Sequence, residues 1–237
     1  MPNKLENFKN VIALIPCLNE EKAINKVILG FKKIGITEII VADGHSDDNT
    51  AKVAKENGAK IVMVRRGKGN GFRDLLGELK LQDDKYYIMI DGDFTYLPEE
   101  LHLLFKKAIQ TNADVIMGRR PLWAKNHRNF GELFRNLIHI IGNLIISGTG
   151  SILYLKPTRD ICTGYWLFKG KALKKINSKL TAQRFELEAD LFSSAAKLKM
   201  KIESVPISYR KRIGESKLKF ADAFIIIKKL ITNRMNK

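Results

Sequence analysis

Short apolar runs alternate with amphipathic segments along the first half of this 237-residue chain. The runs predict buried strands at residues 11–15, 38–42, 60–64, 86–90 and 114–117. The segments between them carry apolar residues at helical spacing and predict helices from residue 19 onward and at 50–57, 71–81 and 97–111. This alternation predicts a doubly wound α/β domain, in which helices flank a mostly parallel sheet.

The pattern changes after Gly118. It predicts helices at 129–146, 185–198 and 220–235, a strand or turn at 160–169, and a strand at 201–209. Because Pro206 cannot donate to a neighbouring strand, the last strand should lie at an edge of the sheet. No repeat or low-complexity linker interrupts the chain, so residues 1–237 are expected to form a single domain with two halves, 1–118 and 119–237.

Charge divides the chain into the same halves. Lys and Arg number 42 and Asp and Glu 25, a net charge of +17, but residues 1–118 are balanced at 17 basic and 17 acidic side chains. The excess in the second half indicates a polyanionic partner such as nucleic acid, anionic lipid or a phosphorylated substrate, or else a solubilising lysine coat. Aromatic residues are not interleaved with the basic ones, which argues against nucleic acid.

Cysteine content and apolar runs bear on location. Cys17 and Cys162 are too few for a disulfide framework, which favours a reduced cytosolic setting. The most apolar stretch, 138–155, is interrupted by polar residues and glycines, so we expect it to lie on a membrane rather than cross one. The terminal helix at 220–235 is basic and amphipathic, suited to an anionic lipid surface or to packing on the sheet.

Polar residues follow each predicted strand of the first half, at the edge where such sheets bind ligands. Asp91-Gly92-Asp93 comes directly after the fourth strand. Two carboxylates two residues apart can bind a hard divalent cation, which would neutralise a diphosphate. The alternative is a turn with solvated or capping aspartates, but the neighbouring loops favour the metal.

Other loops suit phosphate and nucleotide. The run Gly67-Lys68-Gly69-Asn70-Gly71 could cradle phosphate through backbone amides, or could be a mobile loop. Asp43 could accept hydrogen bonds from a base or ribose, or could serve as an acidic residue at the start of a helix. Arginines suit phosphate oxygens, and they gather at Arg119, Arg120, Arg128 and Arg135 and again within 210–217.

Taken in order, these loops resemble family-2 glycosyltransferases of GT-A fold, and among them the polyprenyl-phosphate sugar synthases, which include the dolichol-phosphate mannose synthases and the archaeal enzymes of protein N-glycosylation. The matching residues are 15–21, 41–50, 67–69, 91–93, 118–119, Asp160 with 163–165, Glu186 with Glu188, and 212–217. The resemblance implies an inverting, metal-dependent transferase that moves a sugar from a nucleotide-sugar to dolichyl or polyprenyl phosphate, with Mg²⁺ or Mn²⁺ as the cofactor.

The resemblance also implies roles for individual residues. It places Pro16, Asn19, Glu20, Asp43, Lys68, Gly69, Asp91 and Gly92 in the nucleotide pocket. It places Asp91 and Asp93 on the metal, with Thr95 at the third contact, where mannose synthases often carry glutamine. It places Arg119, Arg135, Arg212 and Lys217 around the acceptor phosphate and the donor diphosphate. The catalytic set is then Asp91, Asp93, Arg119 and Asp160, with Asp160 orienting an arginine or the acceptor side of the sugar.

Besides Thr95, two positions depart from the family pattern. Ala42 stands where many relatives carry a first aspartate, and Trp166 stands where an arginine usually follows the Gly-aromatic pair. A dedicated base is not required, because a lipid monophosphate with a second pKa near ~6 is largely dianionic at neutral pH.

The donor and acceptor stay open at this point. The archaeal resemblance favours a UDP-sugar, and GDP-mannose is the alternative. A transferase with a soluble acceptor, a nucleotidyltransferase and a basic nucleic-acid-binding module are rivals. The loop after the first strand lacks the glycines of a nucleotidyltransferase, and a nucleic-acid module leaves Asp91 and Asp93 unexplained. We expect a cytoplasmic protein attached peripherally to the membrane, with no partner subunit identifiable.

Overall fold

A computed structural model describes residues 8–122, 130–214 and 222–236, except for the side chains of 130–136. Within these ranges the strands are β1 (Val11–Cys17), β2 (Ile39–Asp43), β3 (Lys60–Met63), β4 (Tyr86–Met89), β5 (Val115–Arg119), β6 (Trp166–Lys169) and β7 (Ile202–Pro206). The helices are α1 (Ile24–Lys33), α2 (Thr50–Glu56), α3 (Lys68–Glu78), α4 (Leu101–Thr111), α5 (Phe130–Tyr154), α6 (Gly170–Asn177), α7 (Leu187–Lys197) and α8 (Asp222–Met235). Short 3-10 turns precede β1 and α4.

The strands form one sheet in the order β3-β2-β1-β4-β6-β5-β7. All neighbouring pairs are parallel except those of β6, which runs antiparallel to β4 and β5. This confirms the expected α/β architecture, and it confirms β7, which contains Pro206, as an edge strand. The chain reverses its direction of winding between β1 and β4, which is where ligands bind in open α/β sheets.

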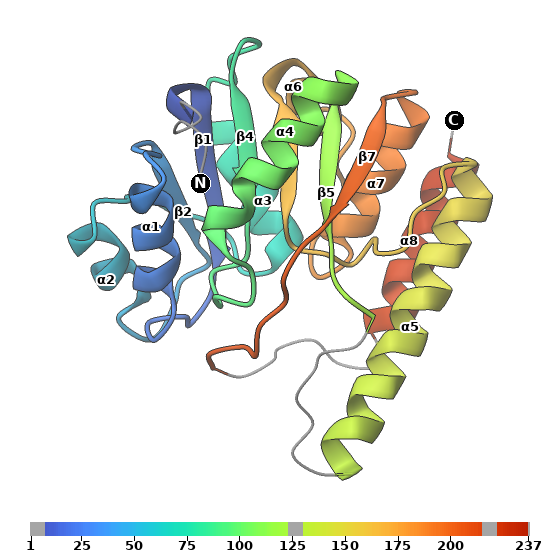
Figure 1. Ribbon diagram of the computed structural model, residues 1–237, viewed down its shortest axis with the longest axis horizontal. Helices are drawn as coiled ribbons and strands as arrows, with labels where there is room; N and C mark the ends of the chain where they lie inside the picture. The colour runs from blue at the N-terminus through green and yellow to red at the C-terminus, as the bar shows by residue number, and fades with distance from the viewer. Residues whose placement is uncertain (1–7, 123–129, 215–221, 237) are drawn as a thin grey trace.

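Both faces of the sheet are covered by helices (Figure 1). On one face Val27 and Phe31 of α1, Ala54 of α2 and Leu104 of α4 pack against the strands. The core on the other face comprises residues of α3, α5, α6, α7 and α8, among them Phe72, Ile146, Leu173, Phe192 and Leu230. Because side chains alternate along a strand, each strand supplies apolar residues to both cores.

Three helices differ from the sequence expectation. Helix α3 begins at Lys68 rather than residue 71, so the Gly-rich run is its first turn and not a mobile loop. Helix α5 continues to Tyr154 because its late glycines and serines remain in the helical ladder. Helix α6 was not anticipated; its only sequence signal is the spacing of Ala172, Leu173 and Ile176 on one face.

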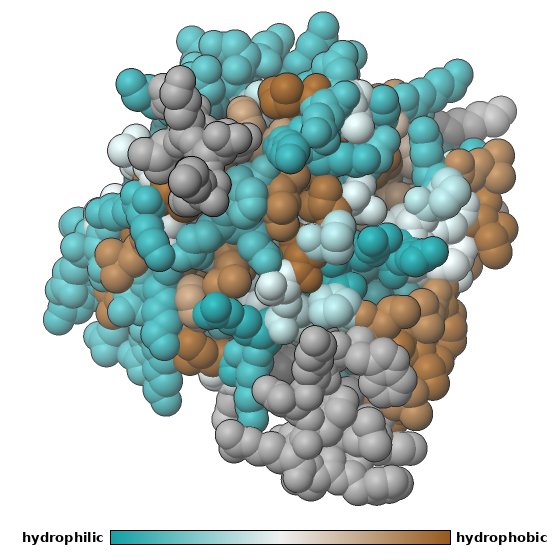
Figure 2. All heavy atoms as spheres, in the orientation of Figure 1, coloured by the Kyte–Doolittle hydropathy of each residue, from teal (hydrophilic) through white to brown (hydrophobic). Residues whose placement is uncertain are grey.

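Helix α5 turns three of its polar side chains toward the protein. Asn143 donates to Asp160 (3.0 Å), Ser147 accepts from the amide of Ile161 (3.0 Å), and Ser151 accepts from the amide of Thr158 (3.0 Å). The outward face is therefore apolar, with Leu137, Ile141, Leu144, Ile145, Ile152 and Leu155 just after the helix all exposed. Figure 2 shows this apolar surface at the right of the molecule.

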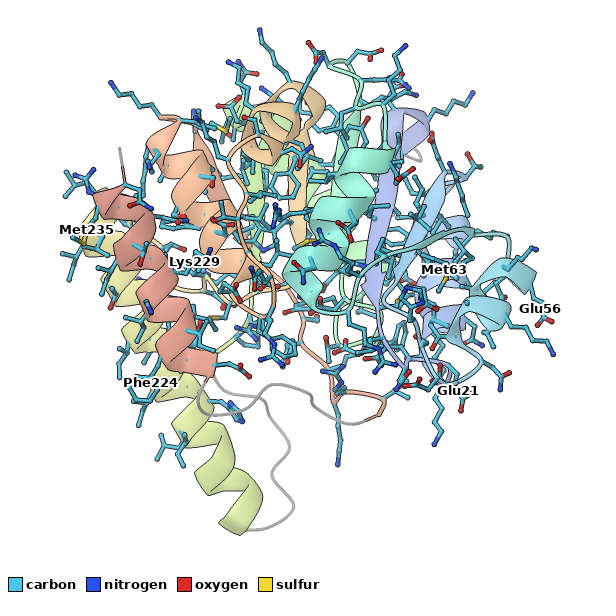
Figure 3. The ribbon with its side chains drawn as sticks, turned by 180° about the vertical axis from the view of Figure 1, so that it is seen from behind. Glu21, Glu56, Met63, Phe224, Lys229 and Met235 are labelled. Atoms are coloured by element: carbon cyan, nitrogen blue, oxygen red, sulfur yellow. The ribbon has the colours of Figure 1, made fainter. Side chains whose placement is uncertain are left out.

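This face bears on the sequence argument about residues 138–155. Three of the polar residues that interrupt the stretch, Asn143, Ser147 and Ser151, face inward and are paired, whereas His139 is exposed. Within the described chain, Leu137–Tyr154 is long and apolar enough to cross a membrane, and only 17% of it is buried. Helix α8 lies beside α5 (Figure 1), and its Phe224 and Met235, exposed at 75% and 76%, lie on the outer side (Figure 3).

We expect Asp190→Ala to lower the free energy of unfolding by about 3 kcal/mol, because it leaves several buried donors without an acceptor. Fully buried Asp190 accepts hydrogen bonds from the amides of Thr181 and Ala182 (2.6 Å each) and from Asn233 of α8 (2.6 Å). Urea denaturation measures the change. The exposed Asp84→Ala is the control and should change stability by less than about 0.5 kcal/mol; equal effects would contradict the structural role of Asp190.

Candidate active site

Three loops at the carboxyl ends of β1, β2 and β4 each contain a residue in the left-handed region. These are Asn19 (φ 52°), His45 (φ 59°) and Phe94 (φ 61°). Such conformations cost roughly 1 kcal/mol or more and persist only where surrounding bonds enforce them. The amide of Asn19 donates to Ser46 Oγ (2.9 Å) and its Oδ1 accepts from the amide of Asp47 (2.8 Å), so the first two loops hold each other in place.

Asp91 lies at the end of β4 in a space that only glycines permit. A Cβ on Gly92 would lie 2.4 Å from Cys17 Sγ, and a Cβ on Gly164 would lie 2.1 Å from Asp91 Oδ2. Gly164 comes just before β6, and its amide donates to Tyr96 Oη (2.8 Å). Because β6 is antiparallel, its beginning lies at the same edge as the carboxyl ends of the other strands.

Asp93 is held by its own loop and by the segment after β7. Thr95 donates to Asp93 Oδ1 from both its hydroxyl (2.6 Å) and its amide (2.9 Å). The amides of Arg210 and Ile213 donate to the carbonyls of Thr95 (2.9 Å) and Asp93 (3.2 Å). The segment after β7 therefore runs along the Asp91–Thr95 loop, as Figure 1 shows beneath β4.

That segment carries Arg212 to the aspartates. Its guanidinium lies 3.2 Å from Asp93 Oδ2 and 2.5 Å from Glu20 Oε1 of the loop after β1. Burial disfavours its charge, but Asp93 and Glu20 outweigh this and raise the pKa of Arg212. Arg212 thus joins residues that lie far apart in the sequence.

Lys68 makes the equivalent contact with Asp91. Its Nζ lies 2.5 Å from Asp91 Oδ1 and also pairs with Glu188 in the first turn of α7. Burial opposes the charge on Lys68, but Asp91 and Glu188 outweigh it and hold its pKa above the ordinary value. Burial raises the pKa of Glu188, and Lys68 partly opposes that rise.

Three amides of the Gly-rich run already bond to the protein. The amides of Gly69, Asn70 and Gly71 donate to the carbonyls of Arg184, Gln183 and Gly67 at 2.9, 2.9 and 2.8 Å. These bonds join the start of α3 to the loop before α7, which places the Lys68 side chain next to Glu188. Of the groups in this run, the Lys68 ammonium is therefore the better candidate for binding phosphate.

Asp43 has one carboxylate oxygen available. The residue is 1% exposed, and its Oδ1 accepts from the amide of Ser46 (2.7 Å). No donor among the described residues reaches its Oδ2. A buried acceptor without a partner is costly, which makes Asp43 a candidate contact for a ligand that donates a hydrogen bond.

Asp160 binds an arginine rather than standing free. Arg120 donates to it from Nε (2.8 Å), Nη2 (2.6 Å) and its own amide (2.9 Å). Asn143 adds a further bond from α5, and Asp160 is 3% exposed. Burial opposes the charge on Arg120, but the nearby Tyr96 and Asp160 hold its pKa well above the ordinary value. With these bonds in place, Asp160 has the geometry of a group that orients Arg120.

Arg119 lies on the side of the sheet toward α5. It lines a groove of about 420 Å³ with Ser151, Ile152, Pro157, Thr158, Arg159 and Ser204. The groove therefore brings two arginines and several hydroxyls next to the apolar face of α5. Arg135 and Lys217, the other residues expected at the acceptor phosphate, lie outside the described side chains.

The structure thus brings Glu20, Lys68, Asp91, Asp93 and Arg212 together, as the sequence order suggested. Thr95 is adjacent, but its hydroxyl donates to Asp93. The sequence alone indicates no role for Glu188 and no partner for Arg120. The signal for both was a buried opposite charge, which only the folded chain reveals.

The donor set fits a magnesium or manganese ion that shares its coordination with a substrate. Asp91 and Asp93 offer carboxylate oxygens, but the described chain gathers no group of three or more His, Cys, Asp or Glu side chains around one point. Mg²⁺ is usually held by one or two carboxylates together with substrate phosphates rather than by an all-protein cage. A diphosphate would therefore complete the coordination that the protein begins.

Comparison with known proteins agrees with this geometry. The family model for glycosyl transferase family 2 matches residues 12–176. The chain belongs to this family. As a family-2 glycosyltransferase, it is an enzyme. The matched region contains Glu20, Asp43, Lys68, Asp91 and Asp93.

Two named relatives of this glycosyltransferase come from archaea. A dolichyl-phosphate hexose transferase of Haloferax volcanii is 29% identical over 213 residues, which cover 89% of this chain and 87% of that protein. The UDP-N-acetylglucosamine–dolichyl-phosphate N-acetylglucosaminyltransferase of Methanococcus voltae is 27% identical over 218 residues, covering 84% and 85%.

Solved structures support the fold. Glucosyl-3-phosphoglycerate synthase of Mycobacterium tuberculosis, in complex with Mn²⁺, uridine diphosphate and phosphoglyceric acid, has a TM-score of 0.69 and 18% identity. The alignment covers 95% of this chain and 77% of that one. The glycosyltransferase described here therefore shares its architecture with a transferase seen with a metal and a nucleotide.

We expect Arg120→Met to lower the free energy of unfolding by about 3–5 kcal/mol, because it leaves the buried Asp160 carboxylate without its main partner. The double variant Arg120→Met with Asp160→Asn should recover at least about half of that loss, since it removes the unpaired charge. Urea denaturation of both gives the comparison. Arg184→Met, at an exposed side chain, is the control; an equal effect there would mean that the Arg120 pair is not structural.

Proposed function

We propose that this enzyme transfers a sugar, with inversion, from a nucleotide-sugar to the phosphate of dolichol or another polyprenol, in the pathway of protein N-glycosylation. The donor we favour is a UDP-sugar, with GDP-mannose as the alternative. The proposal assigns a divalent cation, Mg²⁺ or Mn²⁺, to Asp91 and Asp93. The names of the Haloferax and Methanococcus relatives support the dolichyl-phosphate acceptor.

One observation carries the proposal: two carboxylates and two cations meet at the end of β4. Asp91 and Asp93 suit a metal that binds a diphosphate, and Lys68 and Arg212 suit the diphosphate itself. A ligand that contains both a divalent cation and two phosphates matches this arrangement. Nucleotide-sugars bound with a metal are such ligands.

Asp43 supports a nucleoside next to the diphosphate. Its unpartnered Oδ2 is buried at the end of β2, one strand away from the end of β1. A base or ribose that donates a hydrogen bond would satisfy this oxygen. Pro16 and Asn19, in and after β1, complete the proposed pocket between β1 and β2. The complex of the mycobacterial synthase with uridine diphosphate supports a UDP-sugar.

In the proposed reaction a phosphate oxygen of the lipid attacks the anomeric carbon while the bond from that carbon to the nucleoside diphosphate breaks. The nucleophile is largely dianionic at neutral pH, so no side chain has to remove a proton. A bound divalent ion would supply charge neutralisation for the departing diphosphate. Lys68 and Arg212 orient and neutralise that diphosphate, and Arg119 holds the acceptor phosphate. Asp160 keeps Arg120 beside this path, as a positioning residue.

The apolar face of α5 supports a lipid surface as the place of reaction. Its exposed residues form a continuous stripe with Phe224 and Met235 of α8 nearby. Exposed basic residues flank the stripe, Arg159 after α5 and Lys228 and Arg234 on α8. An apolar stripe with a basic rim suits the surface of an anionic bilayer. The Arg119 groove opens beside this stripe, so a lipid phosphate would reach it from the membrane side.

The first test replaces Asp91 or Asp93 by Asn. We expect either change to reduce metal-dependent turnover by about 100-fold or more, because charge stabilisation of this kind is worth roughly 2.7–4 kcal/mol. The assay uses dolichyl phosphate vesicles with Mn²⁺ or Mg²⁺ and measures nucleoside diphosphate release and lipid-linked sugar for UDP-glucose, UDP-N-acetylglucosamine and GDP-mannose. Full activity in either variant would sink the metal assignment.

Two glycine substitutions in the same assay distinguish a change in the position of Asp91 from a general effect of adding a methyl group. Gly164→Ala pushes a methyl group against Asp91 Oδ2 and should reduce turnover without changing any ionisable group. Gly142→Ala in α5 meets no atom within 4 Å and should leave turnover unchanged. If nucleoside diphosphate is released only with soluble acceptors, the acceptor is a soluble molecule and not a lipid phosphate.

We expect Ile145→Asp to reduce binding to anionic vesicles by about five-fold or more, because a charge replaces an apolar side chain that would insert into the bilayer. Co-sedimentation with vesicles that contain phosphatidylglycerol measures the bound fraction. Ile109→Asp, at a residue of α4 that is 61% exposed, is the matched control and should bind as the parent does. Equal losses would contradict the proposal, as would a wild-type protein that dimerises through this face and does not bind vesicles.

A further inference from the structure

Each aspartate of the proposed metal site is already paired with a cation. Lys68 lies on Asp91 and Arg212 lies on Asp93, at 2.5 and 3.2 Å. A divalent ion that binds these carboxylates has to compete with both side chains. The protein's own cations therefore occupy part of the coordination that the metal needs.

Each of these cations also holds a second carboxylate outside the pair. Lys68 contacts Glu188 and Arg212 contacts Glu20. Glu188 and Glu20 come from α7 and from the loop after β1, so they are not part of the Asp91–Asp93 turn. A cation that leaves its aspartate can remain in the site on its second carboxylate, without crossing to solvent.

Formal charges in the site favour such an exchange. The four carboxylates and two cations leave a formal excess of two negative charges, which one divalent cation would balance. Entry of the ion at Asp91 and Asp93 then leaves Lys68 and Arg212 with one carboxylate each. Both cations are in that state less neutralised and better able to bind phosphate oxygens.

We propose that Lys68 acts as an exchangeable stand-in for the metal, which makes metal and nucleotide bind cooperatively. This inference rests on the proposed function, since it assigns the metal to Asp91 and the diphosphate to Lys68. Without nucleotide, Lys68 bridges Asp91 and Glu188 and weakens binding of the metal alone. With nucleotide, the diphosphate draws Lys68 away from Asp91, and the metal takes the carboxylate. Linkage requires the metal to strengthen nucleotide binding by the same factor.

The test measures free Mn²⁺ by electron paramagnetic resonance in titrations of the full chain, with Mn²⁺ alone and with saturating UDP or GDP. In the parent protein we expect nucleotide to tighten Mn²⁺ binding about ten-fold or more. Lys68→Met should tighten binding of Mn²⁺ alone by about five-fold, since Asp91 is released, and should reduce the nucleotide effect by about five-fold or more relative to the parent. A residue with a merely structural role would not move these two quantities in opposite directions.

Companion variants make the result specific. Glu188→Gln should weaken binding of Mn²⁺ alone, because Lys68 then has only Asp91 as its partner. The double variant Lys68→Met with Glu188→Gln should keep the tighter binding, which shows that release of Asp91 and not a new Glu188 ligand is responsible. Lys60→Met removes the same charge from an exposed site on β3 and should leave Mn²⁺ binding unchanged.

The outcomes separate the inference from the proposed function. If Asp91→Asn leaves nucleotide-dependent Mn²⁺ binding unchanged, the metal assignment itself is wrong. If that binding depends on Asp91 but Lys68→Met binds Mn²⁺ no tighter than Lys60→Met does, the stand-in role is overturned and the metal site stands. If Lys68→Met does not fold, Glu188→Gln decides, and unchanged or tighter Mn²⁺ binding there overturns the inference.

Discussion

Charge pairing between the two halves of the chain is the interaction on which the site depends. Lys68 and Asp91 belong to the first half and meet Glu188 of the second; Arg212 of the second half meets Glu20 and Asp93 of the first. Carboxylates this close together and this poorly exposed would repel one another without the intervening cations. The ion pairs therefore do two things at once: they close the sheet's carboxyl edge, and they set the electrostatic conditions for a ligand that carries both signs of charge.

The helices that cover the sheet are not equivalent. Those on the α1 side cover a core and face water with polar side chains, as is usual for a doubly wound domain. Helix α5 differs, since its Asn143 and Ser147 bond to the protein while Ile141, Leu144, Ile145 and Ile152 face outward. Its inner side holds the Asp160–Arg120 pair, so the same helix connects the proposed lipid surface to the arginines of the site.

Much of this arrangement follows from the sequence. Asp43, Asp91 and Asp93 each follow a predicted parallel strand. Because parallel strands end at the same edge of a sheet, the sequence predicted that these residues lie at one edge. The partners of Lys68 and Asp160 did not follow, since they depend on how α7 and the end of β5 pack, which involves contacts 120 and 40 residues apart. The sequence also did not reveal that Asn143 and Ser147 face the protein. Because α5 contacts several different neighbours, its polar and apolar positions show no simple periodicity. The start of α3 differs from the expectation for a local reason. Gly69 and Gly71 are poor helix formers, but Gly69 packs closely on Ala182 and Gly71 on Val64.

The ion-paired site separates the proposed metal chemistry from folding. In many small metalloproteins the unfolded chain becomes folded only when the ion arrives, so the choice of ion is constrained by stability. Here Lys68 and Arg212 pair with the carboxylates, so the contacts that close this edge of the sheet come from the chain itself. With the proposed metal at Asp91 and Asp93, one divalent ion can replace another in the lineage of the enzyme without any rebuilding of the core.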